Sequence, residues 1–233
     1  MPRVDDQRSQ GVLFIVGTPI GNLKDISQRA IEAIKESGII LAEDKRVTVK
    51  LLNLLDLGRK ELWTLNEHNV MRQIPRVLKA LRAGKTIALV SDAGMPVISD
   101  PGHQLVAACW RESIPVRVVP GPSAVTAALA ASGFPGSRFV FEGFMPRGKS
   151  RRKLLRLLKD ERRTIVFYES PQRIRETLKD ILDIMGNREI FLAREMTKLH
   201  EEYIRGRVSD VLQKLGEEIR GEITVVVSCE GET

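Results

Sequence analysis

Residues 12–22 read VLFIVGTPIGN, a short apolar run that ends abruptly in a loop of glycine, proline and asparagine. The apolar part, Val12–Val16, is typical of a buried β-strand. A helical pattern of apolar residues follows from Ile26 to Glu36 and stops at Ser37 and Gly38. This order of strand, loop and helix predicts the first element pair of an α/β sheet.

The same alternation of apolar runs and helical patterns continues to the end of the chain. Further strands are predicted at Ile39–Ala42, Thr86–Val90, Val116–Val119, Phe139–Phe141, Thr164–Tyr168, Glu189–Ala193 and Ile223–Val227. Further helices are predicted at Lys45–Leu55, Val70–Arg82, His103–Glu112, Ser123–Ala131, Arg151–Lys159, Gln172–Met185 and Ser209–Leu215. Alternation of this kind favours an α/β architecture with largely parallel strands.

One short segment interrupts the alternation. Pro120, Gly121 and Pro122 stand between a predicted strand and a predicted helix, and their composition is typical of a hinge between domains. We therefore expect an N-terminal α/β domain over residues 1–120 with a mostly parallel sheet. A C-terminal α/β domain with a mixed sheet is expected over residues 121–233.

Polar loops follow three of the predicted strands in the first half. They are Gly17–Asn22, Glu43–Arg46 and Ser91–Pro96. Open α/β sheets bind ligands beyond the carboxyl ends of their strands, and small residues let a ligand approach the backbone closely. Each loop alone is ordinary turn chemistry. Three such loops at successive strand ends predict a ligand site.

The chain matches neither of two common nucleotide-binding patterns in a way that supports such a site. Gly17–Asn22 lacks the spacing Gly-x-Gly-x-x-Gly, which disfavours a nicotinamide cofactor. Residues 143–150 do satisfy Gly-x-x-x-x-Gly-Lys-Ser in letters, after an apolar run and before a helix. Bulky Phe144, Met145 and Arg147 nevertheless stand where backbone must wrap a phosphate, so a phosphate-binding loop is disfavoured there.

The positive charge is concentrated in one segment. Between Arg147 and Arg163 there are nine basic residues against two acidic ones, which equals the entire net charge of +7. A concentration of this kind is what contact with a polyanion requires, although a solvated helix face is the simpler alternative. The charge alone therefore leaves two interpretations of the segment, a nucleic-acid contact and a solvated helix face.

Cysteine and histidine usage excludes other classes. Cys109 and Cys229 are far apart, and the three histidines are isolated, so we expect neither a disulfide framework nor a metal site. A reducing cytoplasm is the expected location. No apolar run approaches the roughly 18 residues that a membrane-spanning helix needs.

Six motifs occur in a fixed order along the chain. They are Gly17–Leu23, Ala42–Arg46, Ser91–Gly102, Pro120–Ala124, Phe167–Pro171 and Arg194–Lys198. With them the chain resembles the ribosomal RNA small-subunit methyltransferase I family, within the tetrapyrrole methylase superfamily, which methylates a cytidine ribose 2′-hydroxyl in 16S rRNA. The resemblance extends from Val12 to about Val227 and departs from the family pattern at Lys45, Met95, Gln172 and Met196.

The resemblance implies two α/β domains with S-adenosylmethionine in the cleft between them, and a homodimer that acts on 16S rRNA or the small ribosomal subunit. Matching the motifs places the cofactor against Pro19, Ile20, Asp92, Ala93, Gly94, Ile98, Ser123, Ala124 and Glu169. The basic segment becomes an expected rRNA contact through Arg147, Lys149, Arg151, Arg152 and Lys153.

Methyl transfer to a ribose hydroxyl needs the acceptor to be positioned and its proton to be removed or shared. The groups expected to accept that proton or orient the hydroxyl are Lys198, Glu195, Asp44 and Glu43. A structural ion-pair network is the alternative for this set. Two other functions remain open: a methyltransferase of tetrapyrrole precursors, which needs no basic segment, and a non-catalytic RNA-binding module.

Overall fold

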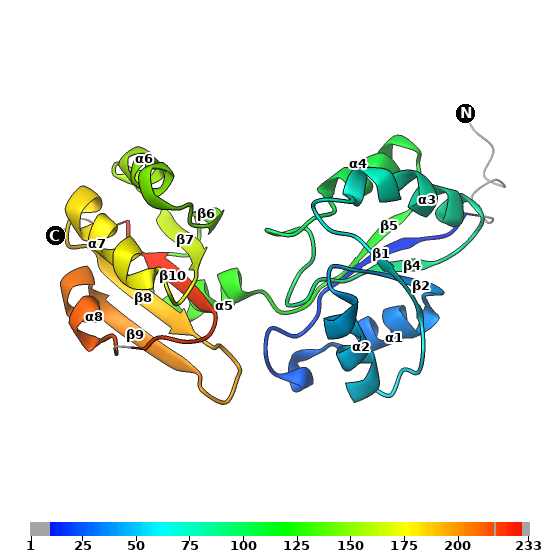
Figure 1. Cartoon of the computed structure of the whole chain (residues 1–233), viewed down its shortest axis with the longest axis horizontal. Coiled ribbons are helices and arrows are strands. Elements are labelled where there is room, and N and C mark those ends of the chain that lie inside the picture. Colours follow the sequence, from blue (N-terminus) through cyan, green and yellow to red (C-terminus); the bar gives the residue numbers. More distant parts are fainter. Residues whose placement is uncertain (1–9, 217, 230–233) are drawn as a thin grey trace. The chain divides into compact units, whose positions relative to one another are not determined.

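The computed structural model describes residues 10–216 and 218–229. The chain divides into two compact units, unit 1 (Met1–Ser123) and unit 2 (Ala124–Thr233) (Figure 1). Each unit contains its own sheet and its own hydrophobic core.

The sheet of unit 1 is entirely parallel. Its strands are β1 (Leu13–Val16), β2 (Ile39–Ala42), β3 (Glu61–Thr64), β4 (Ile87–Leu89) and β5 (Val116–Val119), in the spatial order β3-β2-β4-β1-β5. Because all neighbours run in the same direction, the loops that leave β1, β2, β4 and β5 start from one edge of the sheet. Ligands bind at this edge in open α/β sheets.

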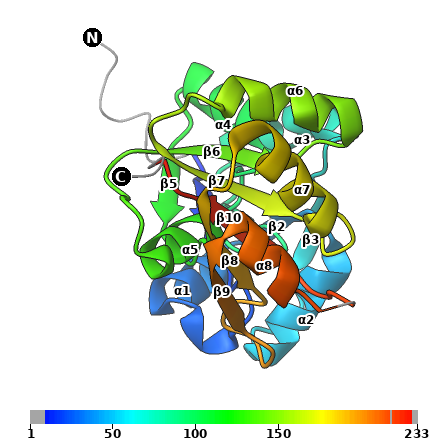
Figure 2. The ribbon, with the colours of Figure 1, turned by 90° about the vertical axis from the view of Figure 1, so that its left-hand side faces the viewer.

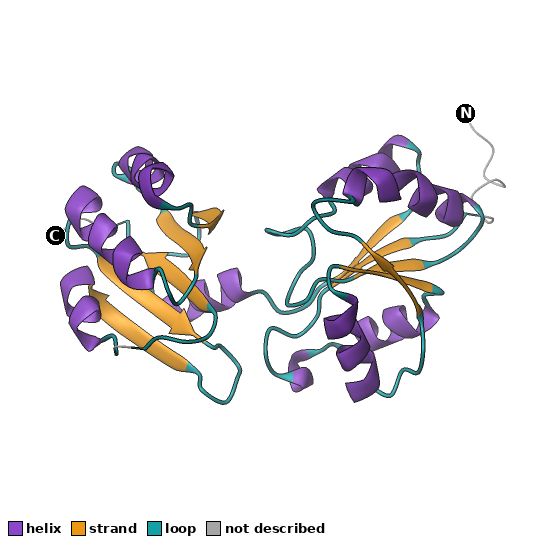
Figure 3. Ribbon diagram, in the orientation of Figure 1, coloured by secondary structure: helices purple, strands orange, loops and turns teal. Residues whose placement is uncertain are grey.

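Helices cover both faces of this sheet (Figure 3). The unit contains the 3-10 turn η2 (Leu23–Asp25) and the helices α1 (Gln28–Glu36), α2 (Lys45–Leu54), α3 (Val70–Arg82) and α4 (His103–Arg111). Alternate strand residues point to opposite faces. Leu41 and Leu89 therefore pack with α3 and α4, whereas Ile40 and Ala88 pack with α1 and α2.

The sheet of unit 2 is mixed. Its strands are β6 (Phe139–Phe144), β7 (Thr164–Glu169), β8 (Glu189–Arg194), β9 (Glu202–Arg207) and β10 (Ile223–Val227), in the order β6-β7-β10-β8-β9. Only the pair β6–β7 is parallel, and the other three pairs are antiparallel. The predicted fold class, with one parallel and one mixed α/β sheet, is confirmed.

Three helices of unit 2 pack on one face of its sheet, as Figure 2 shows. These are α6 (Gly148–Leu158), α7 (Ile174–Met185) and α8 (Val208–Lys214). They cover Ile223, Val225 and Val227 of β10. The fourth helix, α5 (Ala124–Ser132), contacts β10, β8 and β7.

Two strands are not predicted from the sequence, because neither contains a run of apolar residues. In β3 only Trp63 is buried, and β9 contains no buried residue. Both are edge strands, whose outer sides are not covered by a neighbouring strand. Among residues 10–216 and 218–229, every helix is too short or too polar to cross a bilayer.

Candidate functional site

Two of the predicted ligand loops of unit 1 are joined by Thr18. Its backbone N–H donates a hydrogen bond of 2.9 Å to the carbonyl oxygen of Gly94. Its hydroxyl Oγ1 donates to the carbonyl oxygen of Ser91 at 3.2 Å. Thr18 is fully buried, so these bonds are shielded from water. The loop after β1 therefore holds the backbone of the loop after β4.

The loop after β5 reaches the same place through two glycines. A Cβ atom added to Gly17 would lie 2.6 Å from Cα of Gly121, and one added to Gly121 would lie 2.8 Å from Cα of Gly17. No side chain fits between these backbones, which explains why both positions are glycine. The loops after β1, β4 and β5 thus converge at the carboxyl edge of the sheet.

The long loop between β4 and α4 is held in a strained backbone conformation. Val97 and Ser99 have φ angles of +76° and +64°, in the left-handed region that side chains disfavour. Gly94 and Gly102 have φ angles of +81° and +131°, which glycine tolerates. Strain of this kind persists only where surrounding contacts impose it, and it clusters at functional sites.

Four carboxylates, Glu43, Asp44, Asp92 and Asp100, lie at this edge and influence one another. Burial, followed by repulsion from Asp100 and Asp92, raises the pKa of Glu43. Burial raises the pKa of Asp100 to about 6, against a hydrogen bond with Ser91 that lowers it. Glu43, Ser91 and Asp100 line one narrow hollow. The cluster is thus a region of negative potential that favours a cationic ligand.

Asp44 differs from the other carboxylates because it is occupied by the fold. It caps α2 by accepting a hydrogen bond of 2.8 Å from the backbone N–H of Arg46. Hydrogen bonds from the Arg46 guanidinium and backbone lower the pKa of Asp44 to about 2. The Asp44 carboxylate is therefore a weak base and a poor proton acceptor.

Asp92 has acceptor capacity left over. Its Oδ1 accepts a hydrogen bond of 3.1 Å from the backbone N–H of Asp44, which connects the loop after β4 to the loop after β2. Its Oδ2 has no hydrogen-bond partner among residues 10–216 and 218–229. Burial raises the pKa of Asp92. Asp92 can therefore accept a hydrogen bond from a ligand hydroxyl or ammonium group.

The structure separates the expected cofactor residues by unit. Pro19, Ile20, Asp92, Ala93, Gly94, Ile98 and Ser123 lie in unit 1, whereas Ala124 and Glu169 lie in unit 2. Within unit 1, Ala93 and Ile98 are exposed, Ile20 is buried, and Cγ2 of Ile20 lies 3.2 Å from the position of a Cβ on Gly94. The loops after β1 and β4 therefore bring Ile20 and Gly94 together.

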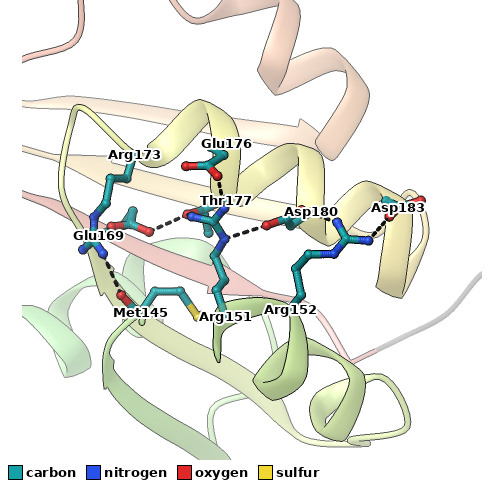
Figure 4. Close-up of polar contacts among 9 residues, drawn as sticks. All are labelled: Met145, Arg151, Arg152, Glu169, Arg173, Glu176, Thr177, Asp180 and Asp183. Carbon is teal, nitrogen blue, oxygen red and sulfur yellow. Dashed lines mark hydrogen bonds and ion pairs between the residues drawn. The ribbon is translucent and has the colours of Figure 1, made fainter. Parts of the chain in front are cut away.

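The Glu169 side chain has another role. It is fully buried at the end of β7 and forms an ion pair of 2.7 Å with Arg173. The hydroxyl of Thr177 and the backbone N–H of Ser170 also donate to its carboxylate. Arg173 in turn donates to the carbonyl oxygen of Met145 at 3.0 Å (Figure 4). The carboxylate thus holds the loops after β6 and β7 together and has no exposed oxygen, and the expected cofactor contact of Glu169 stays a prediction.

Lys198 and Glu195 lie close together, as the motif in residues 194–198 predicts. Nζ of Lys198 donates to Oε1 of Glu195 and to Oε2 of Glu222, each at 2.9 Å. Burial opposes the charge of Lys198, but hydrogen bonds to Glu195 and Glu222 outweigh it and raise the Lys198 pKa. Lys198 is thus a cation at neutral pH and not a proton acceptor. The same hydrogen bond lowers the pKa of Glu195.

The basic segment forms α6 and its flanks, and the structure corrects one of its residues. The Arg151 side chain is only 1% exposed and forms ion pairs of 2.7 Å with Glu176 and Asp180 of α7. Arg152 pairs with Asp180 and Asp183 (Figure 4). Arg151 therefore cannot reach an RNA. Arg147, Lys149 and Lys153 are exposed, and their contact with RNA stays a prediction.

Two residues of the carboxyl edge were missed as site residues in the sequence. Thr18 and Asp100 both lie within predicted motifs, but nothing in their spacing shows that Thr18 bridges two loops or that Asp100 is half-buried. The motif Asp100-Pro101-Gly102 was the available signal for Asp100. For Thr18 the signal was a small β-branched hydroxyl residue directly after a buried strand.

Comparison with known proteins gives concordant results. The family model described as Tetrapyrrole (Corrin/Porphyrin) Methylases matches residues 12–212. A Thermotoga maritima protein named Ribosomal RNA small subunit methyltransferase I is 58% identical over 94% of this chain and 98% of its own length. A Halalkalibacterium halodurans protein with the same name is 47% identical over 96% of this chain and 78% of its own.

Solved structures show the same fold. A diphthine synthase matches with a TM-score of 0.72 at 15% identity, covering 93% of this chain and 89% of its own. A cobalt precorrin-4 methyltransferase matches with a TM-score of 0.68 at 18% identity, covering 99% of both chains. The resemblance found in the sequence is confirmed: the chain belongs to the tetrapyrrole methylase family and, within it, to the ribosomal RNA small subunit methyltransferase I proteins.

Proposed function

We propose that this protein transfers a methyl group from S-adenosylmethionine to the ribose 2′-hydroxyl of a cytidine in the 16S rRNA of the small ribosomal subunit. The observation that carries the proposal is the 58% identity, over nearly the full length of both chains, with a protein named Ribosomal RNA small subunit methyltransferase I. The nucleotide and the ribose oxygen follow from the family resemblance of the motifs.

The carboxyl edge of unit 1 has the chemistry that the cofactor needs. S-adenosylmethionine carries a sulfonium, an ammonium group and ribose hydroxyls, which suit a negative site with a free carboxylate oxygen. The residues that would hold it are Pro19, Ile20, Asp92, Ala93, Gly94, Ile98 and Ser123, with Ala124 at the start of α5. When bound, the cofactor supplies an electrophilic methyl group.

Among the four groups expected to act on the proton, Glu43 suits the role of acceptor. Asp44 is tied to Arg46, and Lys198 and Glu195 are tied to each other. The Glu43 side chain has no hydrogen bond or ion pair with a described residue, and burial raises its pKa. A carboxylate whose pKa lies closer to neutrality is a stronger base while it stays ionised. Asp100 lines the same narrow hollow, and its charge adds to the rise in the pKa of Glu43.

The experiment is a methylation assay on small ribosomal subunits that lack the modification. Subunit RNA is digested to nucleosides after incubation with protein and labelled S-adenosylmethionine, and the expected product is 2′-O-methylcytidine. Label on a base, or none on RNA with transfer to a tetrapyrrole precursor, contradicts the proposal. Calorimetry with S-adenosylmethionine tests cofactor binding separately, and light scattering tests the homodimer.

Glu43→Gln tests the proton acceptor within the same assay. The substitution keeps the size of the side chain and removes its basicity, so kcat should fall roughly 100-fold. The dissociation constant for S-adenosylmethionine should change little. Glu36→Gln, an exposed carboxylate at the end of α1, is the control. An unchanged kcat removes Glu43 from the mechanism and leaves the proposed function intact.

A further inference from the structure

The cations of α6 fall into two groups that differ in their partners. Arg151 and Arg152 face α7 and form ion pairs with its carboxylates. Lys149, Lys153 and Arg156 are exposed and form no ion pair with any residue in the described part of the chain. Within the described residues, the side of α6 that faces α7 therefore has acidic partners, and the exposed side has none.

Helical spacing explains this division. Arg151, Leu155 and Leu158 follow at i, i+4 and i+7, and all three are buried. Lys149, Lys153 and Arg156 follow the same spacing on the opposite side of the helix. We name these three residues the α6 outward face. Arg147, the N-cap of α6, is also exposed and adds a positive charge immediately before the first turn of the helix.

The three positive charges of the α6 outward face repel one another and so destabilise the fold slightly. Like charges at positions i and i+4 lie about 5–6 Å apart and repel each other by a few tenths of a kcal/mol. Within the described part of the chain no carboxylate forms an ion pair with these three side chains, and the acidic residues of α7 pair with Arg151 and Arg152 instead. Binding to a polyanion relieves the repulsion, because its phosphate charges neutralise these side chains. The side chains in turn displace the counterions condensed on the polyanion.

We propose that the α6 outward face binds the phosphate backbone of the substrate RNA, whereas Arg151 and Arg152 fasten the helix to α7. The proposal rests on the proposed function, because it assigns a surface to the RNA that the enzyme methylates. An anionic membrane fits the surface less well. Leu155 and Leu158 are buried in the core of unit 2, and Leu157 is the one large apolar side chain of α6 that is exposed, which is too little apolar surface to insert a helix into lipid.

The test compares two triple variants of the full chain. Lys149→Gln with Lys153→Gln and Arg156→Gln removes the α6 outward face. Lys79→Gln with Lys179→Gln and Lys214→Gln removes the same charge from exposed positions on α3, α7 and α8. Binding to 16S rRNA is measured by filter retention across a range of salt concentrations, together with the KM and kcat of subunit methylation.

The first variant should bind 16S rRNA at least roughly tenfold more weakly, and the slope of log Kd against log salt should become shallower by about 2, from three lost phosphate contacts. Its KM should rise, with kcat and cofactor affinity unchanged. The control variant should keep most of the affinity and the slope. If the wild-type protein methylates subunits and the two variants bind 16S rRNA with equal affinity and equal salt dependence, this inference is overturned and the proposed function stands. No methylation by the wild-type protein overturns the proposed function instead. Binding to vesicles of anionic lipid but not to RNA also overturns this inference.

Discussion

Nε of Arg151 donates a hydrogen bond of 2.7 Å to Oδ2 of Asp180 between α6 and α7 (Figure 4). The same guanidinium donates to the hydroxyl of Thr177, which donates to Glu169 at the end of β7. One buried arginine therefore connects α6, α7 and the central part of the sheet of unit 2. A charge in this position is stable only while its partners remain in place.

We expect Arg151→Met to destabilise unit 2 by roughly 3 kcal/mol, near the lower end of the range for breaking a buried ion pair, because Arg152 still pairs with Asp180. Hydrogen exchange of peptides from α6 and α7 measures the effect. Lys153→Met removes a charge from the exposed side of the same helix and should leave exchange unchanged. Equal exchange in the two variants would show that the buried network contributes nothing to stability.

Much of the fold follows from sequence periodicity. The predicted bounds of α3 (Val70–Arg82) and β5 (Val116–Val119) agree with the structure, because each has a clear apolar pattern and a breaker at its end. The edge strand β9 could not be predicted in this way. It is stabilised by pairing with β8 and not by burial of an apolar side.

The sequence predicts which loops form the site, but it does not predict which side chains pair with one another. The helix of the basic segment was predicted to begin at Arg151, which would leave that residue in an exposed first turn. In the structure α6 begins at Gly148, so Arg151 shares the inward side with Leu155 and Leu158. The spacing i, i+4, i+7 was visible in the sequence. The partners on α7 were not, because contacts between helices depend on tertiary packing.

Gly121→Ala tests whether the loops after β1 and β5 must touch. The new Cβ would lie 2.8 Å from Cα of Gly17, so backbone must shift, and unit 1 should lose about 1–3 kcal/mol. Affinity for S-adenosylmethionine should fall because the loops at the carboxyl edge move. Fluorescence follows unit 1 selectively, since both tryptophans, Trp63 and Trp110, lie in it.

Gly38→Ala is the control for this substitution. Gly38 is exposed, and the nearest atom to its added Cβ, the Thr86 carbonyl oxygen, lies 3.9 Å away. That variant should unfold and bind cofactor like the wild-type protein. If Gly121→Ala does the same, the close approach of the two backbones is not required.

Asp100 predicts a pH dependence of the stability of unit 1. Burial raises its pKa to about 6 in the folded chain, whereas an unfolded chain releases this proton near pH 4. The folded state therefore binds the extra proton between these values. The stabilisation from Asp100 is fully present below about pH 4 and is lost as the pH rises through about 6.

Asp100→Asn removes this dependence. Above pH 6 the variant should be more stable than the wild-type protein, and the difference should shrink as the pH falls toward 4. Urea unfolding followed by tryptophan fluorescence at several pH values measures it. Asp25→Asn, at an exposed carboxylate of the same unit, should run parallel to the wild type. A constant difference between Asp100→Asn and wild type across this range would contradict the raised pKa.

Lys198 and Glu195 carry the last prediction. Their hydrogen bond raises the pKa of the lysine and lowers that of the glutamate, so both are charged at neutral pH and form a fixed dipole beside Glu222. Such a pair can orient a substrate or stabilise developing negative charge.

Lys198→Ala and Glu195→Ala should each lower kcat by at least roughly tenfold while calorimetry shows unchanged affinity for S-adenosylmethionine. Lys214→Ala, on the exposed side of α8, serves as the control. If the loss of kcat is accompanied by faster hydrogen exchange throughout unit 2, the pair is a structural ion-pair network, and unchanged rates in both variants exclude it from the mechanism.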